Sequence, residues 1–222
     1  DALEKLRALI SCSSAGDEEE RSLAYDDDRG LLRFLRARDF DVKRAFSMAS
    51  STMDWRKKWK PRNITFDLMP TAAASGTWRF AGHTKCGMPV ILARTWLWRP
   101  AEYYGTAEFV NYVAWFLETA LTMRTIPSDS SRDDCDIQRI FVIFDLTGFS
   151  LYHHNDMRCF TTLVSIVQSM YPETLGMAVC VNAPWVFQGV WAVIKPLLDP
   201  ATVARYVWYG TNIHICILSL YL

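Results

Sequence analysis

The chain lacks a net charge. Its 222 residues carry 24 Lys and Arg against 24 Asp and Glu, so the formal charge at pH 7 is zero. A protein that binds nucleic acid through the phosphates needs a basic face, and this balance argues against that class. Hydrophobic residues make up 50% of the chain and charged residues 22%, which excludes an intrinsically disordered protein. We therefore expect no nucleic-acid partner.

Paired cysteines are also missing. The six cysteines include no Cys-x-x-Cys pair, which argues against a zinc ribbon and against a redox dithiol. A chain of this length buries enough apolar surface to fold without disulfides, so we expect reduced thiols of an intracellular protein and no metal site. The cysteines are Cys12, Cys86, Cys135, Cys159, Cys180 and Cys216.

The motifs of common catalytic families are absent as well. Gly82 and Gly87 have the spacing of a P-loop, but Met88 and Pro89 follow where that loop requires Lys and then Ser or Thr. We interpret this segment as a hairpin turn. The chain has no Gly-x-Ser-x-Gly elbow of an α/β-hydrolase, and spacing places no nucleophile beside a base. We therefore expect no catalytic residues and a protein that is not an enzyme.

No apolar run is long and uninterrupted enough to indicate a membrane span. Residues 175–194 carry no charge, and such a run is nominally long enough to cross a bilayer. Asn182 and Pro184 interrupt it, so a strand, a turn and a helix explain it better. Residues 206–222 are also uncharged, but they include glycine and polar side chains. We expect neither run to span a membrane.

The first 60 residues of the chain are rich in charged side chains and have the pattern of helices. Residues 1–60 predict a short helix, a second helix that starts at three aspartates ending in Asp28, and a third that is capped by Asp41. Residues 61–76 are interpreted as a linker. The apolar residues expected to face inward are Leu31, Leu32, Phe34, Leu35, Val42, Ala45, Phe46, Ala49, Met53 and Trp55.

The rest of the chain, residues 77–222, alternates between strand and helix. Buried strands separated by helices predict an α/β fold with a mostly parallel sheet. The predicted strands are residues 77–81, 90–95, 139–146, 177–182 and 205–209. The predicted helices are residues 106–126, 156–171 and 185–198.

Two of these helices, 106–126 and 185–198, are apolar on more than one side. A helix that is apolar nearly all round is either buried in the core or faces something apolar that is not protein. Periodicity leaves both explanations open.

At this point the residues resemble a known family, the CRAL-TRIO lipid-binding proteins, over about residues 26–209. Four blocks in order carry the resemblance: Leu31-Leu32-Arg33-Phe34-Leu35-Arg36-Ala37-Arg38 with Phe40-Asp41-Val42; Trp55-Arg56-Lys57; Asp145-Leu146 with Gly148; and Tyr171-Pro172-Glu173, Asn182-Ala183-Pro184-Trp185 and Lys195-Pro196-Leu197-Leu198-Asp199-Pro200. The resemblance implies a helical N-terminal lobe, here residues 1–60, and a lipid-binding domain, here 77–222. The sheet would form the floor of a lipid cavity, and the helix at 185–198 would be its gate.

The resemblance also implies a function. It predicts a soluble, monomeric, cytoplasmic protein that touches membranes transiently and transfers or presents phosphatidylinositol, with a bound phospholipid and no other cofactor. In the family's phosphatidylinositol binders the headgroup contacts residues that match Arg56, Lys57, Glu173, Thr202 and Arg205. The residues expected to line the acyl cavity or the gate are Phe109, Val113, Phe116, Ile140, Val142, Phe144, Val167, Trp185, Phe187, Val190, Trp191, Ile194 and Leu198.

Some residues depart from the family pattern. Ile140, Val142 and Val167 stand where phosphatidylcholine-binding members carry small hydroxyl side chains, which argues against phosphatidylcholine exchange. Residues 213–222 do not match the usual closing segment, so the C-terminal part is expected to be incomplete. Two alternatives stay open: a carrier of a neutral ligand such as a tocopherol, retinoid or sterol, and an interaction module of a GTPase regulator.

Overall fold

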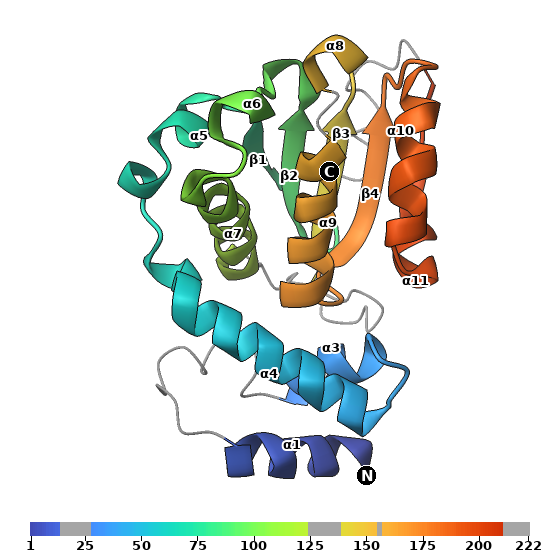
Figure 1. Ribbon diagram of the computed structural model, residues 1–222. Helices are drawn as coiled ribbons and strands as arrows, with labels where there is room; N and C mark the ends of the chain where they lie inside the picture. The colour runs from blue at the N-terminus through green and yellow to red at the C-terminus, as the bar shows by residue number, and fades with distance from the viewer. Residues whose placement is uncertain (14–27, 124–138, 155–156, 211–222) are drawn as a thin grey trace. The chain divides into compact units, whose positions relative to one another are not determined.

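A computed structural model describes residues 1–13, 28–123, 139–154 and 157–210 of the chain (Figure 1). The chain forms two compact units. The first consists of residues 1–63 together with 165–173, and the second of residues 64–164 together with 174–222. The sequence predicts an N-terminal lobe at residues 1–60 and does not predict that residues 165–173 belong to the same unit. Periodicity along the chain does not show which distant segments pack together.

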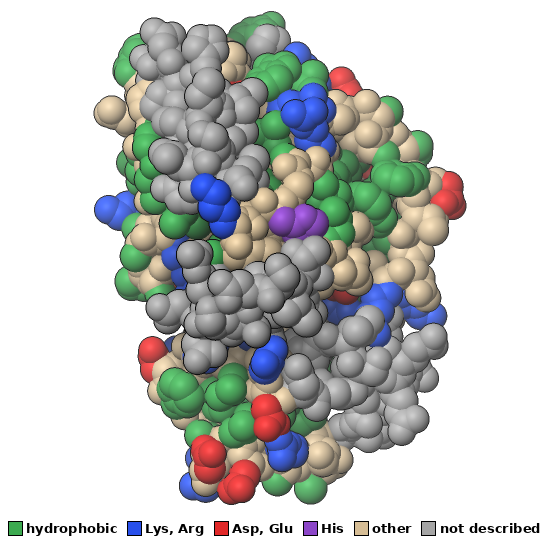
Figure 2. All heavy atoms as spheres, turned by 180° about the vertical axis from the view of Figure 1, so that it is seen from behind, with side chains coloured by type: hydrophobic (Ala, Val, Ile, Leu, Met, Phe, Trp, Pro, Cys, Tyr) green, Lys and Arg blue, Asp and Glu red, His purple; other side chains and the backbone are tan. Residues whose placement is uncertain are grey.

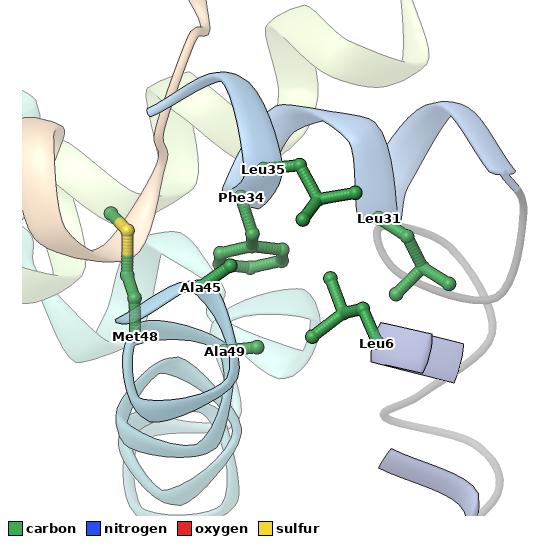
Figure 3. Close-up of a cluster of buried hydrophobic side chains, with 7 residues drawn as sticks. All are labelled: Leu6, Leu31, Phe34, Leu35, Ala45, Met48 and Ala49. Atoms are coloured by element: carbon green, nitrogen blue, oxygen red, sulfur yellow. The ribbon is translucent and has the colours of Figure 1, made fainter. Parts of the chain in front are cut away.

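The first unit is built on three helices, α1 (Ala2–Ser13), α3 (Asp28–Arg36) and α4 (Val42–Trp59). They bury one apolar cluster, shown in Figure 3, in which the Phe34 ring lies against Ala45 and Leu6 points toward the same centre. Alanine on α4 lets the ring approach the helix closely, which a larger side chain would prevent. The cluster comprises Leu6, Leu31, Phe34, Leu35, Ala45, Met48 and Ala49.

Helix α4 has a defined cap at each end. The Asp41 carboxylate accepts the backbone N–H of Arg44 at 3.0 Å, as the sequence predicts for an N-cap. At the other end Lys60 has φ +44°, and its N–H donates to the Arg56 carbonyl at 2.8 Å. This left-handed residue satisfies a carbonyl of the last turn and ends the helix.

The segment interpreted as a linker, residues 61–76, contains short helices. This segment forms η1 (Pro61–Asn63), η2 (Phe66–Leu68) and α5 (Pro70–Ala74). The Glu108 carboxylate accepts the N–H groups of Thr71 and Ala72 at 3.0 and 3.1 Å and so caps α5. A cap supplied by a residue far along the chain leaves no local pattern, so spacing along the chain does not predict α5.

The second unit contains the five-stranded sheet that the sequence predicts. Its spatial order is β1-β2-β3-β4-β5, and only the β1–β2 pair is antiparallel. Strand β2 is the most buried, as its run Val90-Ile91-Leu92-Ala93 leads one to expect of a strand covered on both faces. The strands are β1 (Trp78–His83), β2 (Pro89–Arg94), β3 (Ile140–Asp145), β4 (Leu175–Val181) and β5 (Tyr206–Trp208).

Helices connect the parallel strands, and Figure 1 shows α7 and α9 in front of the sheet with α10 beside β4. The predicted gate helix is divided in two. Helix α10 ends at Ile194, and the 3₁₀ turn η4 follows, in which Pro196 has no N–H to continue the α-helical bonds. The elements are η3 (Thr95–Leu97), α6 (Pro100–Tyr103), α7 (Ala107–Thr122), α8 (Leu151–His154), α9 (Met157–Met170), α10 (Phe187–Ile194), η4 (Lys195–Leu197) and α11 (Pro200–Val203).

The uncharged run at residues 175–194 is divided into β4, a turn and α10, as expected. Within the described part of the chain, no helix has the length and apolarity needed to cross a membrane. Residues 211–222, which complete the second uncharged run, lie outside the described residues. On the face shown in Figure 2, Lys, Arg, Asp and Glu side chains are interspersed with hydrophobic ones, which is the mixed surface that the balanced composition predicts.

The cysteines differ from expectation at one position. Cys12, Cys159 and Cys180 are free thiols, but Cys86, in the turn between β1 and β2, is disulfide-bonded. Spacing along the chain could not reveal this, because a disulfide depends on which residues meet in space. Two further cysteines, Cys135 and Cys216, lie outside the described residues.

We expect Asp41→Ala to lower the free energy of unfolding by about 1 kcal/mol, because it removes the acceptor for the first turn of α4. Chemical denaturation would measure the change. Asp41→Asn is the matched control and should stay close to the parent chain, since asparagine caps helices about equally well. Equal losses in the two variants would show that the carboxylate acts in some other way.

A candidate apolar binding cavity

The second unit encloses a cavity of about 100 Å³ between the sheet and its covering helices. Three helices each contribute residues spaced three or four apart, so one stripe of each helix faces the cavity. From the helices these are Phe109, Tyr112 and Val113 of α7, Phe160, Leu163 and Val164 of α9, and Phe187, Trp191 and Ile194 of α10. From the loops and α6 they are Thr77, Thr95, Trp98, Tyr103, Leu146 and Phe149.

The floor of the cavity is one row of residues across all five strands. Trp78 pairs with Ala93, Ala93 with Phe144, Phe144 with Cys180, and Cys180 with Trp208. All five line the cavity, as do Arg94 and Tyr206. Residues at the same register on neighbouring strands point to the same face, so the pairing of the strands alone makes this floor continuous.

Aromatic rings make up much of the wall around α10. Trp191 lies 4.8 Å from the Tyr206 ring and 4.9 Å from the Trp208 ring, measured between centroids. The Phe149 and Phe187 rings meet edge to face at 5.0 Å. Such pairs contribute roughly 0.5–1.5 kcal/mol each beyond the area they bury. Helix α10 is thus held to β5 largely through rings.

Burial raises the pKa of the thiol and phenol groups in this wall. Burial raises the pKa of the Cys180 thiol to about 12. Burial also raises the pKa of Tyr103 and of Tyr206, and it raises that of Tyr112 although the Trp78 N–H donates to its hydroxyl at 2.8 Å. Each shift follows from the cost of placing a charge among apolar groups. The cavity therefore offers a low-dielectric environment.

Among the described residues that line the cavity, Arg94 is the one that carries a charge. Its guanidinium donates from Nη2 to the backbone carbonyl of Gly76. The charge is therefore directed toward the chain just before β1 begins. The remaining lining consists mostly of aliphatic and aromatic side chains.

Six of the predicted cavity residues do line the cavity: Phe109, Val113, Phe144, Phe187, Trp191 and Ile194. The other seven predicted residues are not among its lining: Phe116, Ile140, Val142, Val167, Trp185, Val190 and Leu198. Phe116, Ile140 and Val190 are buried elsewhere in the unit. Val167 belongs to the first unit, and Trp185 is 84% exposed. A contact between any of the thirteen and an acyl chain stays a prediction.

Several lining residues were missed by the sequence analysis, among them Cys180, Tyr206 and Trp208. One signal would have found Cys180. Phe144 was predicted to line the cavity, and aligning the ends of the two buried strands pairs it with Cys180. The loop residues Trp98 and Phe149 had no such signal, because their positions depend on the turns that follow β2 and β3.

The five predicted headgroup residues divide between the two units. Arg56, Lys57 and Glu173 belong to the first unit; Arg56 is buried, at 1% exposed, whereas Lys57 is exposed. Glu173 has φ +56°, which lies in the left-handed region that residues other than glycine rarely adopt. Thr202 and Arg205 belong to the second unit.

Thr202 and Arg205 both have structural partners. The Thr202 hydroxyl donates to Asp199 Oδ2 at 2.6 Å, and its N–H donates to Asp199 Oδ1 at 2.7 Å, so this pair caps α11. Arg205 Nη1 donates to the Leu175 carbonyl at 2.9 Å, where β4 begins. These contacts place the Arg205 side chain at the amino end of the parallel strands. Its contact with a headgroup stays a prediction.

Comparison with known proteins agrees with this architecture. Residues 75–216 match the family described as CRAL/TRIO domain, and residues 2–49 match the CRAL/TRIO N-terminal domain. The match to the CRAL/TRIO domain covers more than half of the chain. It includes the mostly parallel sheet and the apolar cavity. The chain belongs to the CRAL-TRIO family, as its residues predict.

Several curated relatives of the chain are fungal proteins. The chain is 30% identical over 196 residues to a phosphatidylinositol transfer protein CSR1 of Eremothecium gossypii, covering 83% of this chain and 42% of that protein. It is 30% identical over 219 residues to a SEC14 cytosolic factor of the same organism, covering 95% and 68%. A SEC14 cytosolic factor of Yarrowia lipolytica is 32% identical over 194 residues, covering 84% and 39%.

The chain thus spans less than half the length of two of these relatives. Among solved structures, the crystal structure of Sfh5 has a TM-score of 0.71 at 21% identity, covering 93% of this chain and 78% of that one. At that identity the likeness shows a shared fold.

We expect the Cys180 thiol to be alkylated at pH 8 at least about a hundredfold more slowly than the exposed Cys12 thiol. With a pKa of about 12, only roughly one Cys180 side chain in 10⁴ is a thiolate at that pH, and the thiolate is the reactive form. Mass spectrometry of peptides after timed iodoacetamide treatment measures both rates. In guanidinium the two rates should converge. Equal rates in the folded protein would show that the cavity wall is open to water.

Proposed function

We propose that this chain binds a phospholipid in the cavity of its second unit and carries it between membranes, and that the lipid is phosphatidylinositol. The observation that supports this best is the cavity itself, whose wall is apolar across all five strands and three helices. The names of the relatives, a phosphatidylinositol transfer protein and SEC14 cytosolic factors, support the choice of lipid and a cytoplasmic location. We further propose that the chain acts as a monomer and performs no chemistry on the lipid.

The energetics of lipid transfer explain why such a cavity is needed. Moving acyl chains into water costs about 0.8 kcal/mol per methylene group, hence roughly 20 kcal/mol or more for a lipid with two chains. A carrier removes this barrier by offering the chains an apolar surface along the whole path. The row from Trp78 to Trp208 provides such a surface across the width of the sheet.

The size of the cavity requires an element that moves. An engineered protein cavity of about 150 Å³ holds one benzene molecule, so two acyl chains need more room than the cavity of about 100 Å³ provides. We infer that α10 is this element. Its outer side is exposed at Val193, and breaks in regular structure flank it at Asn182, which has φ +55°, and at Asp199. A hinge-like opening at these two points would separate Trp191 from β5 and let the lipid replace its ring contacts.

Recognition of the headgroup by the second unit is proposed to involve Thr202 and Arg205, which match the family's pattern. Within the second unit, Arg205 lies where a phosphate could approach the amino end of β5. Its guanidinium can hold a phosphate through two parallel hydrogen bonds, which the lysine usual in the family cannot do. Ile140 and Val142 supply no hydroxyl on β3, which favours an inositol lipid over phosphatidylcholine.

A second candidate is a carrier of a neutral hydrophobic ligand. It is favoured by the lining of the cavity, in which Arg94 is the single charged residue and donates to a backbone carbonyl. A ligand without a phosphate would leave no charge unpaired in such a site.

We expect Arg205→Ala to weaken binding of phosphatidylinositol by roughly ten- to a hundredfold, because it removes a charge-assisted pair with the phosphate. A fluorescent phosphatidylinositol transfer assay between vesicles measures this. Arg205→Lys keeps the charge and should retain most activity, and Arg79→Ala, an exposed arginine on β1, is the matched control. Unchanged transfer by a folded Arg205→Ala variant would contradict the headgroup assignment and favour the neutral ligand.

We expect Leu163→Trp to abolish binding of either class of ligand, because the larger side chain fills the cavity that Leu163 lines. Native mass spectrometry of protein expressed in a eukaryotic host would show whether a lipid is bound. Thermal unfolding identifies a variant that fails to fold, in which case Val164→Phe, a smaller increase at the same wall, takes its place. A folded variant that still carries a full lipid would exclude this cavity as the binding site.

A further inference from the structure

One end of the cavity is polar, although most of its wall is apolar. It lies where β1 begins and β2 ends, because Arg94, the last residue of β2, donates its backbone N–H to the Thr77 carbonyl at 2.8 Å. Four residues with polar side chains line the cavity at this end, and a serine lies beside them. We call the five residues the polar corner: Ser75, Thr77, Arg94, Tyr103 and Tyr112.

Short contacts hold the polar corner together. The Ser75 and Thr77 hydroxyl oxygens lie 2.9 Å apart. The Tyr112 hydroxyl accepts the Trp78 N–H at 2.8 Å. Burial raises the pKa of Tyr112, and the Trp78 N–H, the Ser75 hydroxyl and the Arg94 charge each oppose part of that rise. The guanidinium and the hydroxyl groups therefore share one small region of the cavity wall.

The Tyr103 hydroxyl is buried, and no described residue forms a hydrogen bond with it. Tyr103 ends α6 and is only 2% exposed, and the centroid of its ring lies 6.4 Å from that of Phe109 and 6.3 Å from that of Tyr112. The nearby Thr77 hydroxyl is engaged with the Leu97 carbonyl at 3.3 Å. A buried hydroxyl without a partner is costly, so its presence in a cavity wall indicates a ligand group that it binds.

Arg94 carries a second unpaired donor. Its Nη2 donates to the Gly76 carbonyl, whereas its Nε–H is buried and has no acceptor in the described part of the chain. Among the described carboxylates, none forms an ion pair with Arg94. A guanidinium beside an apolar cavity is stabilised most strongly by an anion that accepts its free N–H.

The two unpaired groups are both hydrogen-bond donors. Burial raises the pKa of Tyr103, so its hydroxyl keeps its proton well above neutral pH. The Arg94 guanidinium stays protonated at every pH at which proteins are folded. Two donors in one corner fit a group with several lone pairs, and the positive charge selects an anionic one. A carboxylate meets both requirements through its two oxygens.

The rest of the cavity suits the hydrocarbon chain of such a carboxylate. From the polar corner the floor continues as the row from Trp78 to Trp208, which crosses five strands and is about 19 Å long at the usual strand spacing. The residues of this row carry no charge. A single acyl chain also needs less room than the two chains of a phospholipid, in a cavity of about 100 Å³.

We propose that the polar corner binds the carboxylate of a free fatty acid, with Tyr103 and Arg94 each donating one hydrogen bond and the acyl chain lying along the floor of the cavity. This ligand goes beyond the proposed function. Arg205 lies at the amino end of the parallel strands, and Arg94 lies at the carboxyl end of β2, so the two arginines are at opposite edges of the sheet. A phosphatidylinositol whose phosphate contacts Arg205 would leave only hydrocarbon for the polar corner.

The test compares a fluorescent fatty acid, cis-parinaric acid, with its methyl ester, which keeps the carbonyl oxygen of a phospholipid ester and has no charge. Fluorescence titration of the lipid-free parent chain measures both dissociation constants. We expect the acid to bind at least about tenfold more tightly than the ester. Equal affinities would show that an ester carbonyl satisfies the polar corner, and would overturn the proposal.

Tyr103→Phe removes the unpaired hydroxyl and little else. We expect it to weaken binding of the acid at least about fivefold and binding of the ester less, because a hydrogen bond to a charged acceptor is the stronger one. Thermal unfolding of the lipid-free variant should match that of the parent chain. Tyr104→Phe is the matched control, since Tyr104 is not among the cavity lining and its hydroxyl lies 3.3 Å from that of Thr162. Arg94→Gln should abolish the preference for the acid, and Tyr103→Phe decides alone if that variant fails to fold.

Native mass spectrometry of the parent chain from a eukaryotic host separates this inference from the proposed function. If the chain carries phosphatidylinositol but shows no preference for the acid, the proposed function stands and the inference is overturned. If it prefers the acid through Tyr103 but carries no phosphatidylinositol, the proposed function fails and the inference stands. The inference is also overturned if Tyr103→Phe keeps the full preference, if Tyr104→Phe loses it equally, or if Tyr103→Phe destabilises the lipid-free chain.

Discussion

The contact between Trp191 on α10 and the rings of Tyr206 and Trp208 on β5 is the one on which the cavity depends. Aromatic side chains close the cavity at this point. An acyl chain can replace these ring contacts with other van der Waals contacts at little cost in free energy. A covering helix held by buried ion pairs would leave charges uncompensated each time it moved. An apolar closure is therefore compatible both with a stable cavity wall and with repeated opening.

The same constraint explains the environment of the polar groups in the cavity wall. Burial raises the pKa values of Cys180, Tyr103 and Tyr206 further above neutral pH, so an apolar chain meets neutral thiol and phenol groups at these positions. Several polar hydrogen bonds of the second unit lie at the two edges of the sheet, away from the cavity wall. Asp199 and Thr202 cap α11 at one edge, and Asn182 bonds to Asp145 at the other. These hydrogen bonds lie before and after α10. They fix the chain on either side of the two proposed hinge points.

Much of the fold was predictable from local patterns. The cap at Asp41, the order of strands and helices and the parallel sheet followed from residue types and spacing, because capping and periodicity act over a few residues. The six cavity residues followed from resemblance to the family. The cap of α5 by Glu108, the disulfide at Cys86 and the inward turn of Trp98 and Phe149 did not follow, because each depends on groups that meet only after folding. The headgroup residues came from resemblance to the family, and nothing in the spacing of Arg56 or Arg205 distinguishes them from ordinary surface charges.

The sequence by itself determined the five strands and the long helices, and it supplied α10 with more apolar side chains than one buried face requires. Tertiary structure decided what those side chains surround. The register between strands places Trp78, Ala93, Phe144, Cys180 and Trp208 in one row, although they come from five segments far apart along the chain. A side-chain period of two is a local property of each strand, but alignment between strands is set by hydrogen bonds across the sheet, and only that alignment turns five separate residues into a floor.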